Sequence, residues 1–387
     1  MKKKIVGIFV CMLMFTTVLS VAAPVDKKVM EVTPASLSLA KNLGKNNIAQ
    51  KITTLISEPF NNRTVEVDLN GTILWEKNGL SMPAEADRLM NGNTLISEVG
   101  SAQVIEVNQG GAIVWNYSVL GGPFDADRLT NGNTLIADTY GFRVIEVNTS
   151  GMVVWEKTNL NIPTDLQRLE NGNTLITEAL EYRVIEVDAA GTIQWIYQGT
   201  NALYGAERLA NGNTLISDTL NNRIIEVDNG GTIVWEIDGL YQPTHAERLT
   251  NGNTLIAQFF NNTVKEVDMT GAVVWELTGF NAFDAERIQP VFHVTIKKGF
   301  GITATIENIG NANASNVEVT ITVTGGFVLL NKAKVVSVGD IAIGDSGKAR
   351  CFPIGIGKIT IEAKVTCGEE SEGYGNASGF LVLFFII

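Results

Sequence analysis

Six positions, spaced at nearly regular intervals of 40 residues, form a column in which acidic side chains predominate. Each lies three residues before an arginine, and the column contains Glu85, Asp125, Asp165, Gly205, His245 and Asp284. Carboxylates gathered around one opening can bind a divalent cation through oxygen ligands, or they can simply be solvated. Because no Asp-x-Asp-x-Asp loop accompanies them, we expect no metal ion and no cofactor, with a divalent cation as the alternative.

Two members of this column break its pattern. His245 replaces a carboxylate, and Gly205, which follows Tyr204, lies one repeat earlier. Near-identical repeats create a symmetric environment, so a site for one ligand must use positions at which one repeat differs. A histidine can act as a nucleophile, which makes His245 the candidate catalytic residue. The predicted binding site contains Glu85, Asp125, Asp165, Tyr204, His245 and Asp284.

Other residues follow the same period but have a structural explanation. Equal numbers of opposite charges predict a repeated ion-pair scaffold, and one tryptophan per repeat predicts packing between repeats. The arginines are Arg88, Arg128, Arg168, Arg208, Arg248 and Arg287, and the glutamates are Glu66, Glu106, Glu146, Glu186, Glu226 and Glu266. The tryptophans are Trp75, Trp115, Trp155, Trp195, Trp235 and Trp275. The sequence contains no P-loop, serine elbow, zinc-spaced Cys/His set or dinucleotide fingerprint.

Short strands must position these columns. The segment Asn-Gly-Asn-Thr-Leu-Ile recurs from Asn91, Asn131, Asn171, Asn211 and Asn251. Each period holds four short runs rich in β-branched residues, and turns separate them. The Asn-Gly pairs predict type I′ hairpins, and a glycine-containing loop precedes each Trp strand. Four antiparallel strands per 40 residues are typical of a propeller blade.

The ends of the repeat array indicate how it closes. The first copy, from about Ile52, lacks its first strand, whereas residues 284–288 follow the sixth Trp strand without a hairpin partner. If residues 284–288 complete the first blade, no strand edge is left unpaired. We therefore predict an all-β fold class, with a six-bladed β-propeller over residues 52–290.

These repeats resemble those of known propeller families. Residues 217–231 look like an NHL-type repeat, and Arg-Leu-x-Asn-Gly-Asn-Thr-Leu-Ile is similar to the repeats of arylsulfotransferase-like and PQQ-binding-like propellers. The resemblance implies the architecture rather than an activity, because the same blades serve enzymes and inert binders. Arylsulfotransferases use a channel histidine as nucleophile, and His245 occupies a comparable place. The chain lacks the basic cluster that would hold a sulfate, and a PQQ dehydrogenase is disfavoured because those enzymes generally have eight blades.

Residues 291–387 lose the period and contain no tryptophan. Alternating or apolar runs predict strands within residues 302–307, 317–323, 333–338, 358–365 and 379–387, which would form a small sandwich. This region is similar to CARDB and other Ig-like modules of microbial surface proteins. We expect residues 380–387 to be a buried last strand, because eight apolar residues are too few to span a bilayer. The sequence leaves a disulfide between Cys351 and Cys367 open.

The N-terminal segment predicts secretion. Three lysines, an apolar run over residues 5–19 and the small residues of Ser20–Ala23 indicate a signal peptide over residues 1–23, followed by a linker over residues 24–51. An uncleaved anchor is the alternative, and both place the body outside the cell. Seven Asn-x-Ser/Thr sequons are compatible with a glycoprotein.

Charge limits the partners that we expect. The chain has 29 Lys and Arg against 41 Asp and Glu, a net charge of −12, which disfavours nucleic acid. We predict a secreted or cell-surface binding or scaffold module whose partner is a cell-surface protein, a glycan or a small molecule in the channel. Membrane contact is expected only through an uncleaved anchor. The alternative is an extracytoplasmic arylsulfotransferase-like transferase that uses His245, and the sequence leaves both activity and oligomeric state open.

Overall fold

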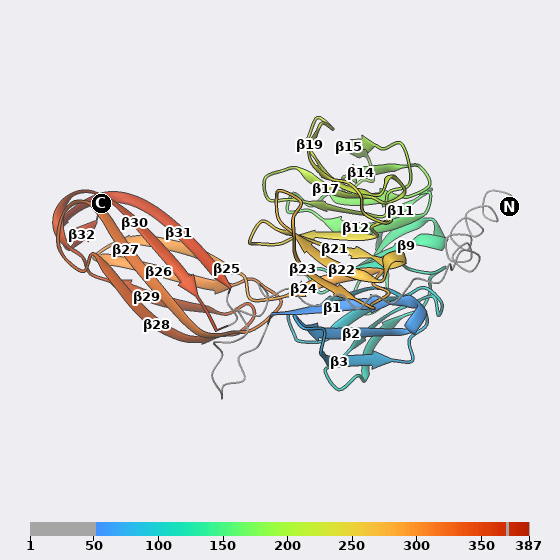
Figure 1. The fold of residues 1–387 in the computed structure, drawn as a ribbon, viewed down its shortest axis with the longest axis horizontal. Helices are drawn as coiled ribbons and strands as arrows, with labels where there is room; N and C mark the ends of the chain where they lie inside the picture. Colours follow the sequence, from blue (N-terminus) through green and yellow to red (C-terminus); the bar gives the residue numbers. More distant parts are fainter. Residues whose placement is uncertain (1–51, 369–370, 387) are drawn as a thin grey trace. The chain divides into compact units, whose positions relative to one another are not determined.

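The computed structural model describes residues 52–368 and 371–386, whose regular secondary structure consists of β-strands and four short 3₁₀ turns (Figure 1). The predicted all-β fold class is confirmed. Six four-stranded antiparallel sheets, which we call blades 1 to 6, contain residues 53–288, and two further sheets contain residues 292–386. The predicted leader (1–23) and linker (24–51) lie outside the described residues.

Each blade runs from an inner strand beside the axis to an outer strand that carries the tryptophan. From inner to outer strand, blade 1 contains β24 (Asp284–Ile288), β1 (Thr53–Glu58), β2 (Arg63–Asp68) and β3 (Ile73–Asn78). Blade 2 contains β4 (Pro83–Arg88), β5 (Thr94–Glu98), β6 (Gln103–Val107) and β7 (Ile113–Tyr117). Blade 3 contains β8 (Asp125–Arg128), β9 (Thr134–Asp138), β10 (Arg143–Val147) and β11 (Val153–Thr158).

The other three blades repeat this order. Blade 4 contains β12 (Pro163–Arg168), β13 (Thr174–Glu178), β14 (Arg183–Val187) and β15 (Ile193–Gln198). Blade 5 contains β16 (Gly205–Arg208), β17 (Thr214–Asp218), β18 (Arg223–Val227) and β19 (Ile233–Ile237). Blade 6 contains β20 (His245–Arg248), β21 (Thr254–Gln258), β22 (Thr263–Val267) and β23 (Val273–Thr278). Single 3₁₀ turns link the second and third strands of four blades: η3 (Pro59–Asn61), η4 (Thr139–Gly141), η5 (Thr219–Asn221) and η6 (Phe259–Asn261).

The first hairpin turn of blades 2 to 6 differs from the predicted type I′ turn. In blade 3, the Gly132 N–H donates to the Leu129 carbonyl, and the Leu129 N–H donates to the Asn133 carbonyl. Gly132 has a φ of +86°, whereas Asn131 is not among the residues with positive φ. The turn is therefore centred one residue earlier and ends with a glycine in the left-handed region. Asn131 stays in an ordinary conformation, and its side-chain oxygen accepts the Asn133 N–H at 2.9 Å.

Pairing between the two ends of the repeat array closes the ring of blades. Strand β24, from the end of the array, pairs antiparallel with β1, so that Thr53 lies opposite Ile288 and Ile56 opposite Ala285. Blade 1 is thus assembled from both ends of the array, and its inner strand comes from residues 284–288. This pairing gives β1 a partner on both sides and removes an open edge that would attract other strands.

A repeated contact joins each blade to the next. An arginine at the end of each inner strand forms an ion pair with a glutamate of the preceding blade, at distances from 2.5 to 3.1 Å. The same guanidinium lies 4.6 to 5.5 Å from the centre of that blade's tryptophan ring. In five of these contacts the indole N–H also donates to a turn carbonyl of the following blade. The contacts therefore fix the angle between neighbouring blades as well as their separation.

Residues 292–386 form two sheets around one shared core. The three-stranded sheet contains β25 (Phe292–Gly299), β26 (Gly301–Asn308) and β29 (Ser346–Cys351). The five-stranded sheet contains β28 (Ala333–Ile341), β27 (Ala314–Leu330), β30 (Ile354–Thr366), β31 (Glu372–Leu383) and β32 (Phe385–Ile386). Strands β25 and β29 were not predicted, because their outward faces carry lysines, threonines and small residues that hide the alternation.

Two further expectations for this region are settled by the structure. Cys351 and Cys367 are not joined by a disulfide, and β29 pairs with β26 rather than with β30. The prediction that residues 380–387 form a buried last strand is wrong, because Leu381 and Ile386 are buried but Leu383 is 62% exposed. Within residues 379–386 only Leu381 and Ile386 are buried, so most of this segment does not contribute to the core.

We expect Arg287 to be the most sensitive member of the arginine column. Its side chain is 1% exposed, pairs with Glu266 at 2.7 Å and donates to Thr54 Oγ1 at 3.0 Å, whereas Arg168 is 22% exposed. Arg287→Met should lower the free energy of unfolding by about 3–5 kcal/mol, because it leaves the mostly buried carboxylate of Glu266 without its cation. Arg168→Met should cost clearly less. Urea unfolding of both variants checks this, and equal costs would contradict the closing role of Arg287.

Candidate functional site on the propeller axis

The inner strands β4, β8, β12, β16, β20 and β24 surround the axis, and they place two rings of side chains around it. Residues two apart on a strand share a face, so the predicted column is joined by the residues two positions later. The first ring contains Glu85, Asp125, Asp165, Gly205, His245 and Asp284, and the second contains Asp87, Asp127, Gln167, Glu207, Glu247 and Glu286. Sequence reasoning missed the second ring, although it has the same period and directly precedes each arginine.

Carboxylates of the first ring accept hydrogen bonds from the neighbouring inner strand. The Ala126 N–H donates to Glu85 at 2.7 Å, and the Leu166 N–H donates to Asp125 at 2.5 Å. The remaining two carboxylates of this ring make the same contact with the next blade. An inner strand is the edge of its sheet, and its outward N–H groups need acceptors when they are buried. The acidic column therefore has a structural task that its sequence pattern did not reveal.

The second ring repeats this arrangement one step further along the axis. The Arg248 N–H donates to Glu207 at 2.8 Å, and the Arg287 N–H donates to Glu247 at 2.9 Å. Gln167, the neutral member, accepts the Arg208 N–H at 2.7 Å, so an amide oxygen can replace the carboxylate in this role. The contact therefore does not require a charged acceptor. The large number of acids on the axis has a separate effect on their pKa values.

That effect is a set of raised pKa values. Burial, together with repulsion from neighbouring carboxylates, raises the pKa of Asp87 to about 7 and that of Asp127 to about 8. Burial also raises the pKa of Asp165 and Glu247 to about 7. The pKa values of Glu85, Asp125 and Glu286 are raised well above their ordinary range for the same reasons. At neutral pH the axis therefore holds both protons and negative charges.

His245 is the cationic member of the first ring. Its Nδ1 lies 3.0 Å from the carboxylate of Asp284, and its side chain is 30% exposed. Burial opposes its protonation, but attraction by Asp284 and then Asp165 outweighs burial and raises the pKa of His245 to about 10. A protonated imidazole has no free electron pair for nucleophilic attack. In this environment His245 is suited to neutralising carboxylates rather than to attacking a substrate.

Aromatic side chains meet at the end of the axis where the inner strands begin. Phe283 of blade 1 contacts both Phe124 of blade 3 (5.6 Å between ring centres) and Tyr204 of blade 5 (6.1 Å), although these three blades alternate around the ring. Tyr204 is 8% exposed. Gly205 does not leave a gap, because a Cβ there would lie 3.4 Å from Ser217 Oγ and from the Thr244 carbonyl.

Three acids on the axis have the spacing of cation ligands. One carboxylate oxygen from each of Glu85, Asp125 and Asp127 lies within 4.8 Å of the others. Oxygen ligands of this kind suit a hard divalent cation. Glu85 and Asp125 also accept backbone N–H groups, so their position has an explanation without an ion. A cation at this position therefore stays the untested alternative to the prediction that no metal ion binds.

Comparisons with known proteins agree with this architecture. A PQQ_2 family model described as outer membrane protein assembly factor BamB matches residues 61–172. A protein of unknown function from Bacteroides caccae has a similar structure, with 19% identity, a TM-score of 0.53, and coverage of 59% of this chain and 94% of that one. Virginiamycin B lyase from Staphylococcus aureus has 14% identity and a TM-score of 0.48, and the match covers 67% of this chain and 89% of that chain. No curated protein matches. The chain thus contains PQQ-like repeats in a propeller-like fold.

The acidic axis predicts a stability that falls as the pH rises. The axial acids hold their protons more tightly when folded, so their cost to folding grows from about pH 4 to about pH 8. His245 contributes stability that is complete below about pH 6.5 and is lost as the pH rises through about 10. The free energy of unfolding should therefore drop by roughly 2 kcal/mol or more between pH 5.5 and 8.5.

Chemical denaturation at both pH values checks this prediction. Asp127→Asn keeps an oxygen acceptor and removes one titrating group, so it should reduce the pH dependence. Glu181→Gln, at a surface turn outside the axis, should leave it unchanged. A parent protein that gains stability towards pH 8.5 would contradict the assignment of raised pKa values.

Proposed function

We propose that the chain is a secreted or cell-surface binding module in which the propeller is a rigid scaffold. The observation that carries this proposal is the structural role of the axial side chains: all four carboxylates of the first ring and most of those of the second accept backbone N–H groups, and His245 pairs with Asp284. The same arginine, glutamate and tryptophan contact occurs between all six pairs of neighbouring blades. Such a frame supports recognition on the surface better than chemistry on the axis. We also propose that residues 291–387 are an Ig-like module of the CARDB kind, since two sheets share one core.

The ligand surface that we favour is the face where the aromatic side chains gather. Ring contacts run from Phe60 to Phe259 (4.8 Å), from Phe259 to Phe283 (5.7 Å) and from Phe283 to Phe124 (5.6 Å). Tyr140 continues this series at 5.8 Å from Phe124. The series thus crosses the axis from the turns of blades 1 and 6 to the turn of blade 3.

Phe124 and Phe259 are each only 2% exposed, so the part of this cluster that a ligand can reach is formed by side chains at the matching turn position. Phe60 is 46% exposed, and Tyr140, Leu180, Leu220 and Phe260 are each partly exposed. Aromatic rings offer large, rigid contact areas to apolar groups and to the flat faces of ligands. The acids on the axis behind them disfavour an anionic ligand. We therefore propose a neutral glycan or a neutral small molecule as the ligand of this face.

A transferase that uses His245 receives less support. The Asp284 contact orients the imidazole, as a catalytic histidine requires, but it also favours the protonated form. The carboxylates around it would repel a sulfate ester. An assay of sulfuryl transfer from an aryl sulfate donor separates the two functions, because the binding module should show no transfer that depends on His245.

A screen of neutral oligosaccharides, followed by calorimetry of any ligand found, tests the binding function. Tyr140→Ala and Phe260→Ala should each weaken binding at least tenfold by removing contact area, without lowering the melting temperature by more than a few degrees. Val154→Ala, on an exposed position of an outer strand, is the matched control and should bind normally. Loss of binding in the control but not in the aromatic variants would move the ligand site elsewhere.

A further inference from the structure

An exposed apolar surface lies at one end of the two C-terminal sheets, near the label C in Figure 1. Four turns lie at this end, and they connect β25 with β26, β27 with β28, β29 with β30, and β31 with β32. Strand register brings them together, because Gly299 pairs with Gly301, Leu330 with Ile354 and Gly355 with Leu383, and Phe300 bridges to Phe385. Seven side chains there are each more than half exposed, and we call them the apolar tip: Phe300, Phe327, Leu329, Leu330, Ile356, Leu383 and Phe385. Contiguous apolar surface of this kind marks an interaction site in a soluble protein.

Positive charge surrounds the apolar tip. Six of the eight Lys and Arg residues in 291–387 lie within six residues of a tip residue in sequence, and we call them the basic collar: Lys297, Lys298, Lys332, Lys334, Arg350 and Lys358. No Asp or Glu occurs in the segments that form this end, residues 293–303, 323–337, 347–361 and 376–386. All eight acids of the region lie elsewhere in it. The region has no net charge, yet its acids are kept away from the end that carries the collar.

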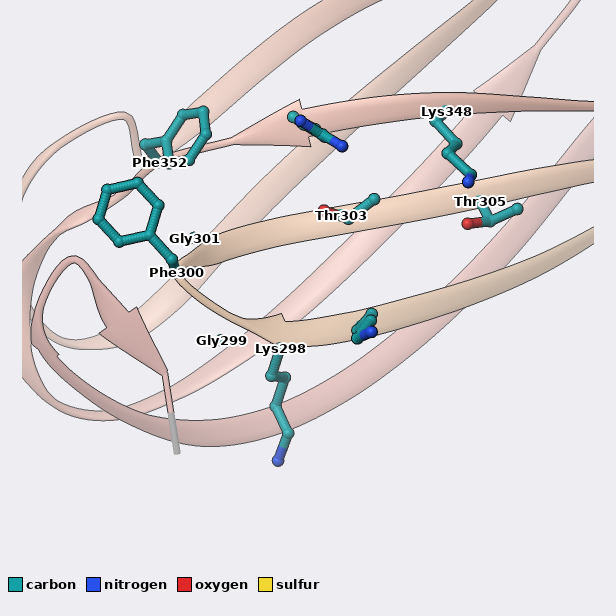
Figure 2. A pocket seen from close by; sticks show the side chains of 10 residues that line it. Lys298, Gly299, Phe300, Gly301, Thr303, Thr305, Lys348 and Phe352 are labelled. Atoms are coloured by element: carbon teal, nitrogen blue, oxygen red, sulfur yellow. The ribbon is translucent and has the colours of Figure 1, made fainter.

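A shallow cavity of about 440 Å³ lies directly behind the tip on the three-stranded sheet. Figure 2 shows Phe300 and Phe352 at its turn end and Lys348 beside Thr305 further along the strands. Register places Thr303 opposite both Lys297 and Arg350 in adjacent strands. Among the described residues, Lys297, Lys348 and Arg350 form no ion pair. The cavity thus offers free cations and hydroxyl groups next to exposed aromatic rings.

The chemistry of this end selects among possible occupants. A polysaccharide or an acidic protein surface would satisfy the collar but would leave the phenylalanines and leucines in contact with water. A second copy of the chain would cover the apolar tip, but a symmetric contact would bring two sets of six cations together. A lipid bilayer with anionic headgroups satisfies both parts, because acyl chains receive the tip and phosphate groups meet the collar.

We propose that this end of the C-terminal sheets is a membrane-docking surface for bilayers that contain anionic lipid. The tip enters the boundary between headgroups and acyl chains, to a depth of about 5–10 Å. It does not span the bilayer, because turn backbones are not tolerated in the hydrocarbon core. Within residues 52–368 and 371–386, no helix is long and apolar enough to cross a membrane. The docking surface is independent of the ligand proposed for the propeller.

Vesicle sedimentation tests this proposal, with the whole chain after removal of the predicted leader in every variant. The parent should bind vesicles of phosphatidylcholine with 30% phosphatidylglycerol at least tenfold more tightly than vesicles of phosphatidylcholine alone. The double variant Phe300→Ser/Leu383→Ser should lose at least tenfold in binding to both. The double variant Lys297→Gln/Arg350→Gln should lose roughly 30-fold, and only on the anionic vesicles.

A control variant and melting temperatures separate a loss of membrane binding from a loss of folding. Lys364→Gln alters a lysine of the same sheets that pairs with Glu372 at 2.6 Å, and it should bind like the parent. All substituted positions are exposed or partly exposed, so melting temperatures should stay close to that of the parent. Absence of vesicle binding by the parent, or binding that both double variants retain, would overturn the proposal. Sedimentation equilibrium that shows a dimer, lost in the tip variant while the parent ignores vesicles, would assign the surface to a second copy instead.

Discussion

The structure depends on hydrogen-bond acceptors for the backbone N–H groups at the unpaired edge of each inner strand. Each blade ends at the axis in a strand whose outward N–H groups have no ladder partner. Side-chain oxygens from the adjacent blade accept these groups, as the carboxylate of Glu85 does for Ala126 at 2.7 Å. Each buried N–H group left without an acceptor would cost about 1–3 kcal/mol. The acids on the axis are thus part of the scaffold, and the surrounding chemistry follows from them.

This arrangement concentrates charge where solvent is scarce. Burial of the carboxylates on the axis, together with their mutual repulsion, raises the pKa of Asp127 to about 8. Protonation of such carboxylates lowers the negative charge on the axis where no cation pairs with them. His245, with a pKa raised to about 10, supplies the single imidazolium of the first ring. At the periphery, by contrast, arginine and glutamate alternate in equal numbers, and tryptophan rings cover the guanidinium groups. The propeller therefore keeps its paired charges between blades and its excess of acids on the axis.

The sequence predicted the parts of the fold that periodicity controls. The tryptophan spacing indicated the blades, and the unpaired segment at residues 284–288 indicated how β24 completes blade 1. The turn type was wrong because Asn-Gly alone does not show whether one or both residues adopt positive φ, and in blade 3 only Gly132 does. In the C-terminal sheets, β25 and β29 were missed because short strands with lysines and glycines resemble loops in sequence.

The candidate site was predictable only in outline. The column that contains His245 and Asp284 was found from its spacing, and the structure brings its members together on the inner strands. Their hydrogen bonds to backbone N–H groups could not be predicted, since the sequence does not show that Asp125 lies beside Leu166 of the next blade. The contact of Tyr204 with Phe283 depends on alternate blades meeting across the axis, which no local pattern reports.

Hydrogen exchange at the inner strands tests the central claim most directly. If carboxylates cap the edge N–H groups, the amides of Ala126 and Leu166 should exchange slowly. The amide of Ala246, which faces Gly205 instead of a carboxylate, should exchange faster. Glu85→Ala should then accelerate exchange at Ala126 by at least tenfold and leave Leu166 unchanged. Equal protection of all three amides, undisturbed by Glu85→Ala, would contradict the account.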